Sequence, residues 1–234
     1  MPDTRLADIQ SVGPARLGPE EALATYHRRM YEQATSLSAY SDTTVMKAEL
    51  PETAQQAEYE LQRQYAAPAT LRFTPVNFKG DRFVKSNVLV RLLQSEVDHV
   101  SKRQGTQTAI NDQNYKFSLK GTEDLNGVNC YVFQVKPRKK RVGLFKGRVY
   151  IDSYTGTMRR AEGTMVKSPS WWIKKIEFVQ DFDEFGGFVF PTRMHSVNRV
   201  RLLGRTIVDV LHRNYRATAA AGSTIFGGGD GSQN

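Results

Sequence analysis

The side chains best suited to chemistry are the four histidines of this 234-residue chain, and they stand far apart at His27, His99, His195 and His212. Glu96 and His99 have the helical spacing at which a carboxylate and an imidazole can share a metal ion. Di-metal bundles need two such pairs and further glutamates, and the sequence holds one pair. A solvated helix face is the better interpretation, so we predict no metal site and no cofactor.

Other catalytic sequence patterns are also missing. The sequence contains no G-x-S-x-G, no phosphate-binding loop, no dinucleotide fingerprint and no H-E-x-x-H. The single cysteine, Cys130, excludes an internal disulfide, and its neighbours Tyr131 and Val132 indicate a packed, inert thiol. We therefore predict that the protein is not an enzyme.

The charge distribution points to an anionic partner. The chain has 33 basic and 24 acidic residues and a formal net charge of +9. Phospholipid headgroups, lipopolysaccharide and nucleic acid are the surfaces that such a charge attracts, and Trp171 and Trp172 could stack on bases. A solvated loop without a specific partner stays open as the alternative. The residues predicted to contact an anionic surface are Lys136, Arg138, Lys139, Lys140, Arg141, Lys146 and Arg148.

Two kinds of hydrophobic periodicity define the elements that would position these residues. Helical spacing occurs from residue 19 to about 37 and from 82 to 103. The alternation typical of strands fills most of the remainder and is clearest at 131–135, 147–152 and 157–164, where the turn 153–156 implies an antiparallel meander. The absence of a βαβ rhythm argues against a parallel sheet. We predict a mainly β, α+β fold: one strongly curved antiparallel sheet of about ten strands, with both helices on its concave face.

Three segments are predicted along the chain. Residues 1–18 form a flexible leader, 19–216 a single domain, and the Gly/Ser-rich residues 217–234 a disordered tail. No window approaches the ~18 to 20 apolar residues of a membrane-spanning helix. The first residues also lack the basic and apolar regions of a signal peptide.

The strand alternation places large apolar side chains on one face of the sheet. Two helices are few to cover so long a sheet, so an unfilled apolar cavity is one prediction, and a lipid or acyl chain is its natural ligand. The alternative is that the helices fill the space and the aromatic residues are only core. The residues predicted to line the cavity, with the helix that covers it, are Tyr59, Leu61, Phe73, Val84, Val88, Leu92, Leu93, Tyr115, Phe117, Leu119, Phe133, Ile176, Phe178 and Met194.

Four segments resemble a known family. NYKF at 114–117, VKPRKK at 135–140, LFKGRVYID at 144–152 and KSPSW at 167–171 are similar to bacterial outer-membrane lipoprotein-sorting proteins, in a poorly characterised carrier-like branch. The resemblance covers roughly residues 20–216. It implies an unclosed β-barrel with helices over a hydrophobic cavity, a periplasmic location, and binding of lipoprotein acyl chains without catalysis.

Three functions follow, in order of preference. The first is a periplasmic protein that binds or sorts lipids or lipoproteins in outer-membrane biogenesis and transport. The second is a sensor or scaffold module with a filled core that binds a protein partner. The third is a basic nucleic-acid-binding protein, whose affinity would fall steeply with salt. We prefer the first, with acyl lipid or lipoprotein as partner, an anionic membrane surface as a further contact, no nucleic acid, and a monomeric state.

Overall fold

The computed structural model describes residues 15–169, 173–201 and 203–221. Most of the predicted leader and tail, and the pair Trp171 and Trp172, lie outside the described residues. The described part contains ten strands: β1 (Leu37–Leu50), β2 (Gln55–Ala66), β3 (Thr70–Gly80), β4 (Tyr115–Leu125), β5 (Val128–Pro137), β6 (Phe145–Asp152), β7 (Met158–Met165), β8 (Ile173–Phe185), β9 (Phe188–Val200) and β10 (Gly204–Ala219).

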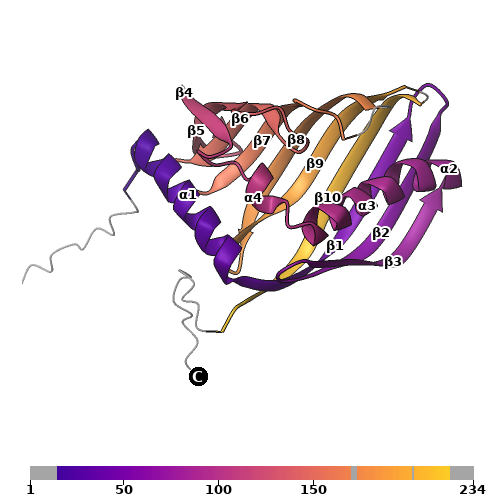
Figure 1. Cartoon of the computed structure of the whole chain (residues 1–234), viewed down its shortest axis with the longest axis horizontal. Coiled ribbons are helices and arrows are strands. Elements are labelled where there is room, and N and C mark those ends of the chain that lie inside the picture. The colour runs from indigo at the N-terminus through magenta and orange to yellow at the C-terminus, as the bar shows by residue number, and fades with distance from the viewer. Residues whose placement is uncertain (1–14, 170–172, 202, 222–234) are drawn as a thin grey trace, which may run out of the picture.

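All ten strands form one antiparallel sheet, in the order β3-β2-β1-β10-β9-β8-β7-β6-β5-β4. The sheet curves strongly and does not close, because β3 and β4 are its two free edges (Figure 1). The predicted fold class is therefore confirmed. The meander predicted from the sequence is the half β4–β9, in which each strand pairs with the next one along the chain.

The helices lie on one side of this sheet (Figure 1). The first, α1 (Pro19–Ser36), begins at the predicted proline, with Glu20 and Glu21 in its first turn, where the helix dipole favours acidic side chains. It ends one residue before the predicted stripe does, because Leu37 already belongs to β1. The second predicted helix consists of α2 (Arg82–Val84), a π-helical turn η1 (Lys85–Leu89) and α3 (Val90–Ser101), followed by the short α4 (Gly105–Thr108). We call α2, η1 and α3 together the covering helix.

A pair of glycines allows β6 and β7 to approach closely in the curved half. Gly147 stands directly opposite Gly163 in the strand register. A Cβ atom on Gly147 would lie 1.8 Å from the carbonyl oxygen of Glu162, a distance that no side chain can adopt. The rings of Phe145 and Phe178, from β6 and β8, pack edge to face at 5.0 Å in the same region. Larger residues at the glycine pair would force these strands apart.

The predicted domain boundary at residue 216 falls inside β10, which continues to Ala219. Cys130 is fully buried, and burial raises the pKa of its thiol to about 11, which agrees with the predicted inert thiol. No helix among the described residues is long and apolar enough to cross a membrane.

Candidate functional site

Two separate hydrophobic clusters occupy the concave face. One lies under α1 and draws its side chains from β4–β8, including Tyr115, Phe133 and Phe178. The other lies under the covering helix and draws its side chains from β1, β2 and β10, including Met46 and Leu61. The clusters share no residue, so each helix buries its own half of the sheet.

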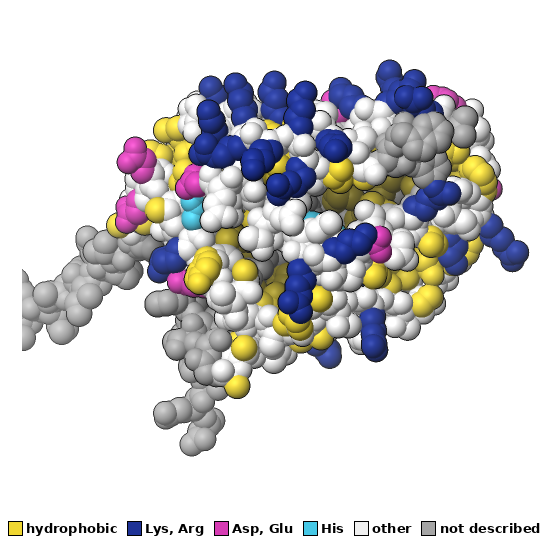
Figure 2. All heavy atoms as spheres, viewed as in Figure 1, with side chains coloured by type: hydrophobic (Ala, Val, Ile, Leu, Met, Phe, Trp, Pro, Cys, Tyr) yellow, Lys and Arg dark blue, Asp and Glu magenta, His cyan; other side chains and the backbone are white. Residues whose placement is uncertain are grey.

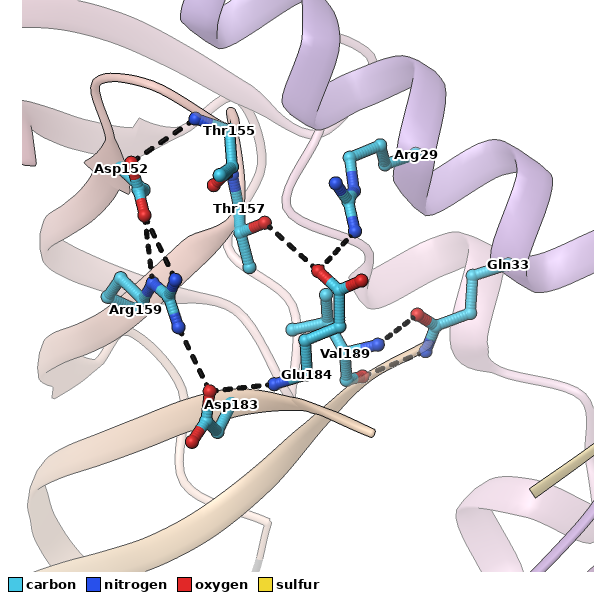
Figure 3. Close-up of polar contacts among 9 residues, drawn as sticks. All are labelled: Arg29, Gln33, Asp152, Thr155, Thr157, Arg159, Asp183, Glu184 and Val189. Carbon is cyan, nitrogen blue, oxygen red and sulfur yellow. Dashed lines mark hydrogen bonds and ion pairs between the residues drawn. The ribbon is translucent and has the colours of Figure 1, made fainter. Parts of the chain in front are cut away.

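The helix α1 is fixed to the β8–β9 hairpin by polar contacts (Figure 3). The side-chain amide of Gln33 donates to the carbonyl oxygen of Val189 at 2.9 Å and accepts from the Val189 N–H at 2.8 Å. The amide thus makes the two hydrogen bonds that the backbone of a neighbouring strand would make. Arg29 forms an ion pair with Glu184, whose carboxylate also accepts from the hydroxyl of Thr157. These contacts make α1 a fixed wall of the concave face.

The covering helix is held in a different way. Its buried residues are few, namely Val84, Leu89 and Leu93. The ammonium group of Lys85 lies 4.3 Å from the ring centres of both Tyr59 and Phe78, a geometry that favours cation–π attraction. Its second polar attachment is an ion pair from Glu96 to the sheet.

A buried polar network supplies that attachment. Arg63 on β2 donates from Nε to Asp42 at 2.6 Å, from Nη1 to Glu96 at 2.9 Å and from Nη2 to the hydroxyl of Tyr215 at 2.7 Å. The side chains of Arg63 and Asp42 are 4% and 0% exposed, whereas that of Glu96 is 40% exposed. Nδ1 of His212 completes the network at 3.1 Å from Asp42. Asp42 is therefore the permanent partner of Arg63, and Glu96 is the partner that joins the helix to the sheet.

Burial and charge shift the pKa values of this network in opposite ways. Burial alone would raise the pKa of Asp42, but the hydrogen bond from His212 and the charge of Arg63 outweigh it and lower that pKa. Burial lowers the pKa of His212, and the positive charge of Arg63 acts in the same direction against the attraction of Asp42 and Glu96. Burial raises the pKa of Tyr40, which packs under the Arg63 guanidinium, to about 12.

We expect His212 to make the protein less stable on mild acidification. Because the folded-state pKa of His212 lies below the unfolded value of ~6.5, the unfolded chain binds the proton first and stability falls below that pH. His212→Asn should reduce the fall between about pH 7 and about pH 5. Urea unfolding midpoints across this range measure the effect.

The remaining fall in the His212→Asn protein belongs to His27, whose pKa burial also lowers, and at the acid end to Asp42. An unchanged pH dependence in the variant would show that His212 gains its proton equally in both states.

The concave face has a hollow beside the covering helix. Figure 2 shows it above α3, over the central strands of the sheet, with hydrophobic side chains in its floor. Met194 on β9 packs at the border of the second cluster and Ile176 on β8 is half-buried. The predicted lining residues that are not fully buried are Phe73, Val88, Leu92, Phe117, Leu119, Ile176 and Met194.

The structure distributes the predicted cavity residues over both clusters. Tyr59, Leu61, Val84 and Leu93 are buried in the cluster under the covering helix, with Phe73, Val88, Leu92 and Met194 packed against it. Tyr115, Phe133 and Phe178 are buried under α1, with Phe117 packed against them. Leu119 is 46% exposed, and Ile176 belongs to neither cluster. The buried members fill the interior, so a ligand would meet the partly buried ones.

Two cavities of about 510 and 480 Å³ lie elsewhere, at one end of β1, β2 and β10, and share Ser41 and Arg216 in their walls. Neither is lined by a predicted cavity residue. The smaller one is lined chiefly by polar side chains, including Asn214, whose φ of 59° marks the irregular pairing of β1 with β10. The walls of the smaller cavity suit a polar ligand, whereas those of the larger one also contain Tyr40 and Tyr65. We place the apolar site in the hollow over the central strands because hydrophobic side chains form its floor.

The predicted basic residues fall into two groups. Arg148 lies between Glu123 and Glu162 in ion pairs, and Arg138 and Arg141 donate to backbone carbonyl oxygens of the segment 107–115. The lysines of the predicted set are exposed, and no side-chain contact ties them to other described residues: Lys136, Lys139, Lys140 and Lys146.

The sequence did not reveal the network around Arg63, although it contained a signal. Arg63 follows Tyr59 and Leu61 on the apolar face of β2, and Asp42 precedes Thr44 and Met46 on the same face of β1. A charge on an apolar strand face needs a partner. Glu96, which the sequence pairs with His99 at helical spacing, contacts Arg63, and no metal-ligand cluster of His, Cys, Asp or Glu occurs in the described residues.

Comparison with known proteins places this chain in a family. A family model described as "-like: Uncharacterized protein" matches residues 98–221, which are more than half of the chain. The chain therefore belongs to that family. No curated protein matches the sequence.

Several solved structures are similar to this chain. A DUF1329 family protein from Desulfovibrio piger has 14% identity and a TM-score of 0.44, and the match covers 83% of this chain and 92% of that one. A LolA superfamily protein from Nitrosomonas europaea has 11% identity and a TM-score of 0.40, with 84% and 92% covered. A domain from Vibrio parahaemolyticus, described as an outer membrane lipoprotein-sorting protein domain, has 11% identity and a TM-score of 0.44, with 86% and 93% covered. The ligand of this chain is therefore argued below from its own residues.

Proposed function

We propose that the protein is a non-enzymatic, periplasmic lipid- or lipoprotein-binding protein that holds acyl chains on its concave face. The observation that carries this proposal is the hollow with a hydrophobic floor beside the covering helix (Figure 2). An apolar surface of this kind is exposed to water until an apolar ligand binds and covers it. The family resemblance of the sequence supports the same ligand class.

The two helices have different parts in this function. The contacts of Gln33 and Arg29 keep α1 in place. The covering helix presents Val88 and Leu92, which are partly buried, and its attachment at Glu96 is partly open to solvent. A ligand that enters beside this helix would therefore contact Val88, Leu92 and the facing Met194 with little rearrangement of the sheet.

The apolar contacts are sufficient for useful affinity. Each buried CH₂ group contributes ~0.8 kcal/mol, so about ten buried carbons of one chain supply roughly 8 kcal/mol, which corresponds to micromolar binding before the costs of association. Such binding needs no chemical reaction. The protein would act by sheltering the chain from water.

A filled core that binds a protein partner is the second candidate. The observation in its favour is that the largest predicted cavity residues, among them Tyr115 and Phe133, are fully packed. The covering helix and β3 also present exposed apolar side chains at Val76, Phe83 and Val90. In this case the hollow would be a docking groove for a folded partner or a peptide.

Native mass spectrometry of the protein purified from a bacterial host, followed by organic extraction and lipid analysis, tests the proposal. We expect co-purifying acyl lipid, or uptake of added phospholipid or acylated peptide by the lipid-free protein. A lipid-free mass with no uptake of either compound would overturn acyl-chain binding and favour the protein-partner function.

A further inference from the structure

The outer face of β4–β6 carries a row of lysines. Lys116 on β4 stands directly opposite Lys136 on β5. On β6, Gly147 stands opposite Val135 of β5, so the adjacent residue Lys146 lies beside Lys136. Like charges placed directly opposite one another weaken a sheet. All three are exposed, and none has a side-chain hydrogen bond or ion pair with another described residue, so nothing in the described protein offsets this repulsion.

The loop between β5 and β6 extends this row. Its arginines turn inward: Arg138 donates to the carbonyl oxygens of Asp112 and Tyr115 at 2.7 and 3.1 Å, and Arg141 to that of Gln107 at 3.4 Å. Gly143, with φ of 86°, packs so closely that a Cβ atom would lie 2.6 Å from the Thr108 methyl group. The loop is therefore held at both ends against the segment that follows α3.

The side chains that this arrangement leaves outward are two cations and one apolar group. Lys139 and Lys140 are exposed, and Val142 is 41% exposed beside them. A fixed loop that presents lysines together with an aliphatic side chain matches the interface of a bilayer, where ammonium groups meet phosphates and the aliphatic group enters the headgroup layer.

Two neighbouring arginines are neutralised by ion pairs. Arg148 pairs with Glu123 and Glu162, and Arg160 pairs with Asp181 at 2.6 Å. The lysines of the row and the loop therefore keep their charge, whereas these two neighbouring arginines do not.

We propose that Lys116, Lys136, Lys139, Lys140 and Lys146, with Val142, form a docking surface for a bilayer that contains anionic phospholipid. This surface is separate from the hollow, so the inference goes beyond the acyl-chain function. Figure 2 shows Lys and Arg side chains gathered along the edge of the sheet over β4–β8, on the rim of the face that holds the hollow. Docking through this rim would bring the open face next to the lipid.

Nucleic acid is the less favoured occupant. Non-specific binding of single strands combines cations with aromatic side chains on which bases stack. Among the described residues, the exposed aromatic side chains are Tyr31, Phe83 and Tyr154, and they lie on α1, α2 and the turn after β6, away from the lysine row and its loop. The surface is thus cationic and aliphatic.

Sedimentation with vesicles tests the docking surface in the full chain. One set of vesicles is phosphatidylcholine alone, and in the other about a third of the lipid is phosphatidylglycerol. Lys136→Ala, Lys139→Ala and Lys140→Ala are combined in one variant. A control variant removes equal charge from exposed sites elsewhere: Lys79→Ala, Arg82→Ala and Arg193→Ala.

We expect the original protein to bind the anionic vesicles alone, with affinity that falls as salt rises. Each surface cation contributes about fivefold to partitioning, so the loop variant should bind about a hundredfold more weakly and the control should be nearly unchanged. Val142→Ser removes the aliphatic group without changing the charge, so it should weaken binding and leave the salt dependence unaltered. Equal binding to both vesicle types, an equal loss in both triple variants, or binding to a single-stranded RNA with none to vesicles would overturn the proposal.

The result can be separated from that of the acyl-chain function. The loop variant should keep its co-purifying lipid in native mass spectrometry, because its substitutions lie outside the hollow. If the protein carried and took up no acyl lipid but still bound anionic vesicles, the docking surface would be supported and only acyl-chain binding would be overturned.

Discussion

Replacing Arg63 by alanine is expected to lower the free energy of unfolding by about 3 to 5 kcal/mol. The change leaves the carboxylate of Asp42, whose side chain is 0% exposed, without its cationic partner. The remaining hydrogen bonds, from Thr44 at 2.7 Å and from His212, do not neutralise the charge. Since domains of this kind are stable by roughly 5 to 15 kcal/mol, the loss is a large share of the total. Urea unfolding followed by circular dichroism at neutral pH measures it.

Two further variants identify the cause. Glu96→Gln removes the other carboxylate of the network, which is partly solvated, and should cost at most about 1 kcal/mol. Asp42→Asn combined with Arg63→Met removes both buried charges, so it should cost less than the sum of the single changes. If the double variant lost as much free energy of unfolding as the two single changes together, or if Arg63→Ala lost less than about 1 kcal/mol, the cause would not be a buried Asp42 carboxylate left without its cationic partner.

The second large effect concerns the ligand. Leu92 on α3 and Met194 on β9 both pack, partly buried, against the cluster under the covering helix. If the hollow binds acyl chains as proposed, Leu92→Asp or Met194→Asp places a carboxylate beside the ligand. An unpaired charge does not share an apolar site with an acyl chain, so we expect the co-purifying lipid to fall at least tenfold. Phe117→Asp, at the border of the cluster under α1, should act in the same direction. Quantitative lipid extraction per mole of protein is the measurement.

The matched control is Val90→Asp on the same helix. Val90 is 42% exposed and lies outside both clusters, so the variant should keep its lipid. Circular dichroism of all variants separates loss of ligand from loss of fold. A folded Leu92→Asp protein with the original lipid content would remove the hollow from the acyl-binding site.

Much of the fold was readable from local patterns. Pro19 with its two following glutamates located the start of α1, and the helical spacing at 82–103 located the covering helix. The turn 153–156 gave the β6–β7 hairpin. These features depend on neighbours in the sequence, where propensity and period act directly.

The parts that could not be predicted depend on strand register between distant segments. The pairing of Arg148 with Glu123 and Glu162 requires β4, β6 and β7 in their final register. To predict that the apolar face divides into two clusters, one must also know which helix covers which strands. The π-helical turn 85–89 has no signal in the residue pattern that we recognised.

The place of the last strand has a consequence for how the chain folds. β10 lies between β1 and β9, so it joins the three strands made first to the six made afterwards. Until residues 204–219 have been made, the two part-sheets have no shared strand, and β1 and β9 each present an unpaired edge. Pairing of residues about 170 positions apart is slow, because a long loop must close before any contact forms. We expect the nascent protein to depend on β10 for protection against aggregation, and to be at greatest risk after β9 and before β10 has been made.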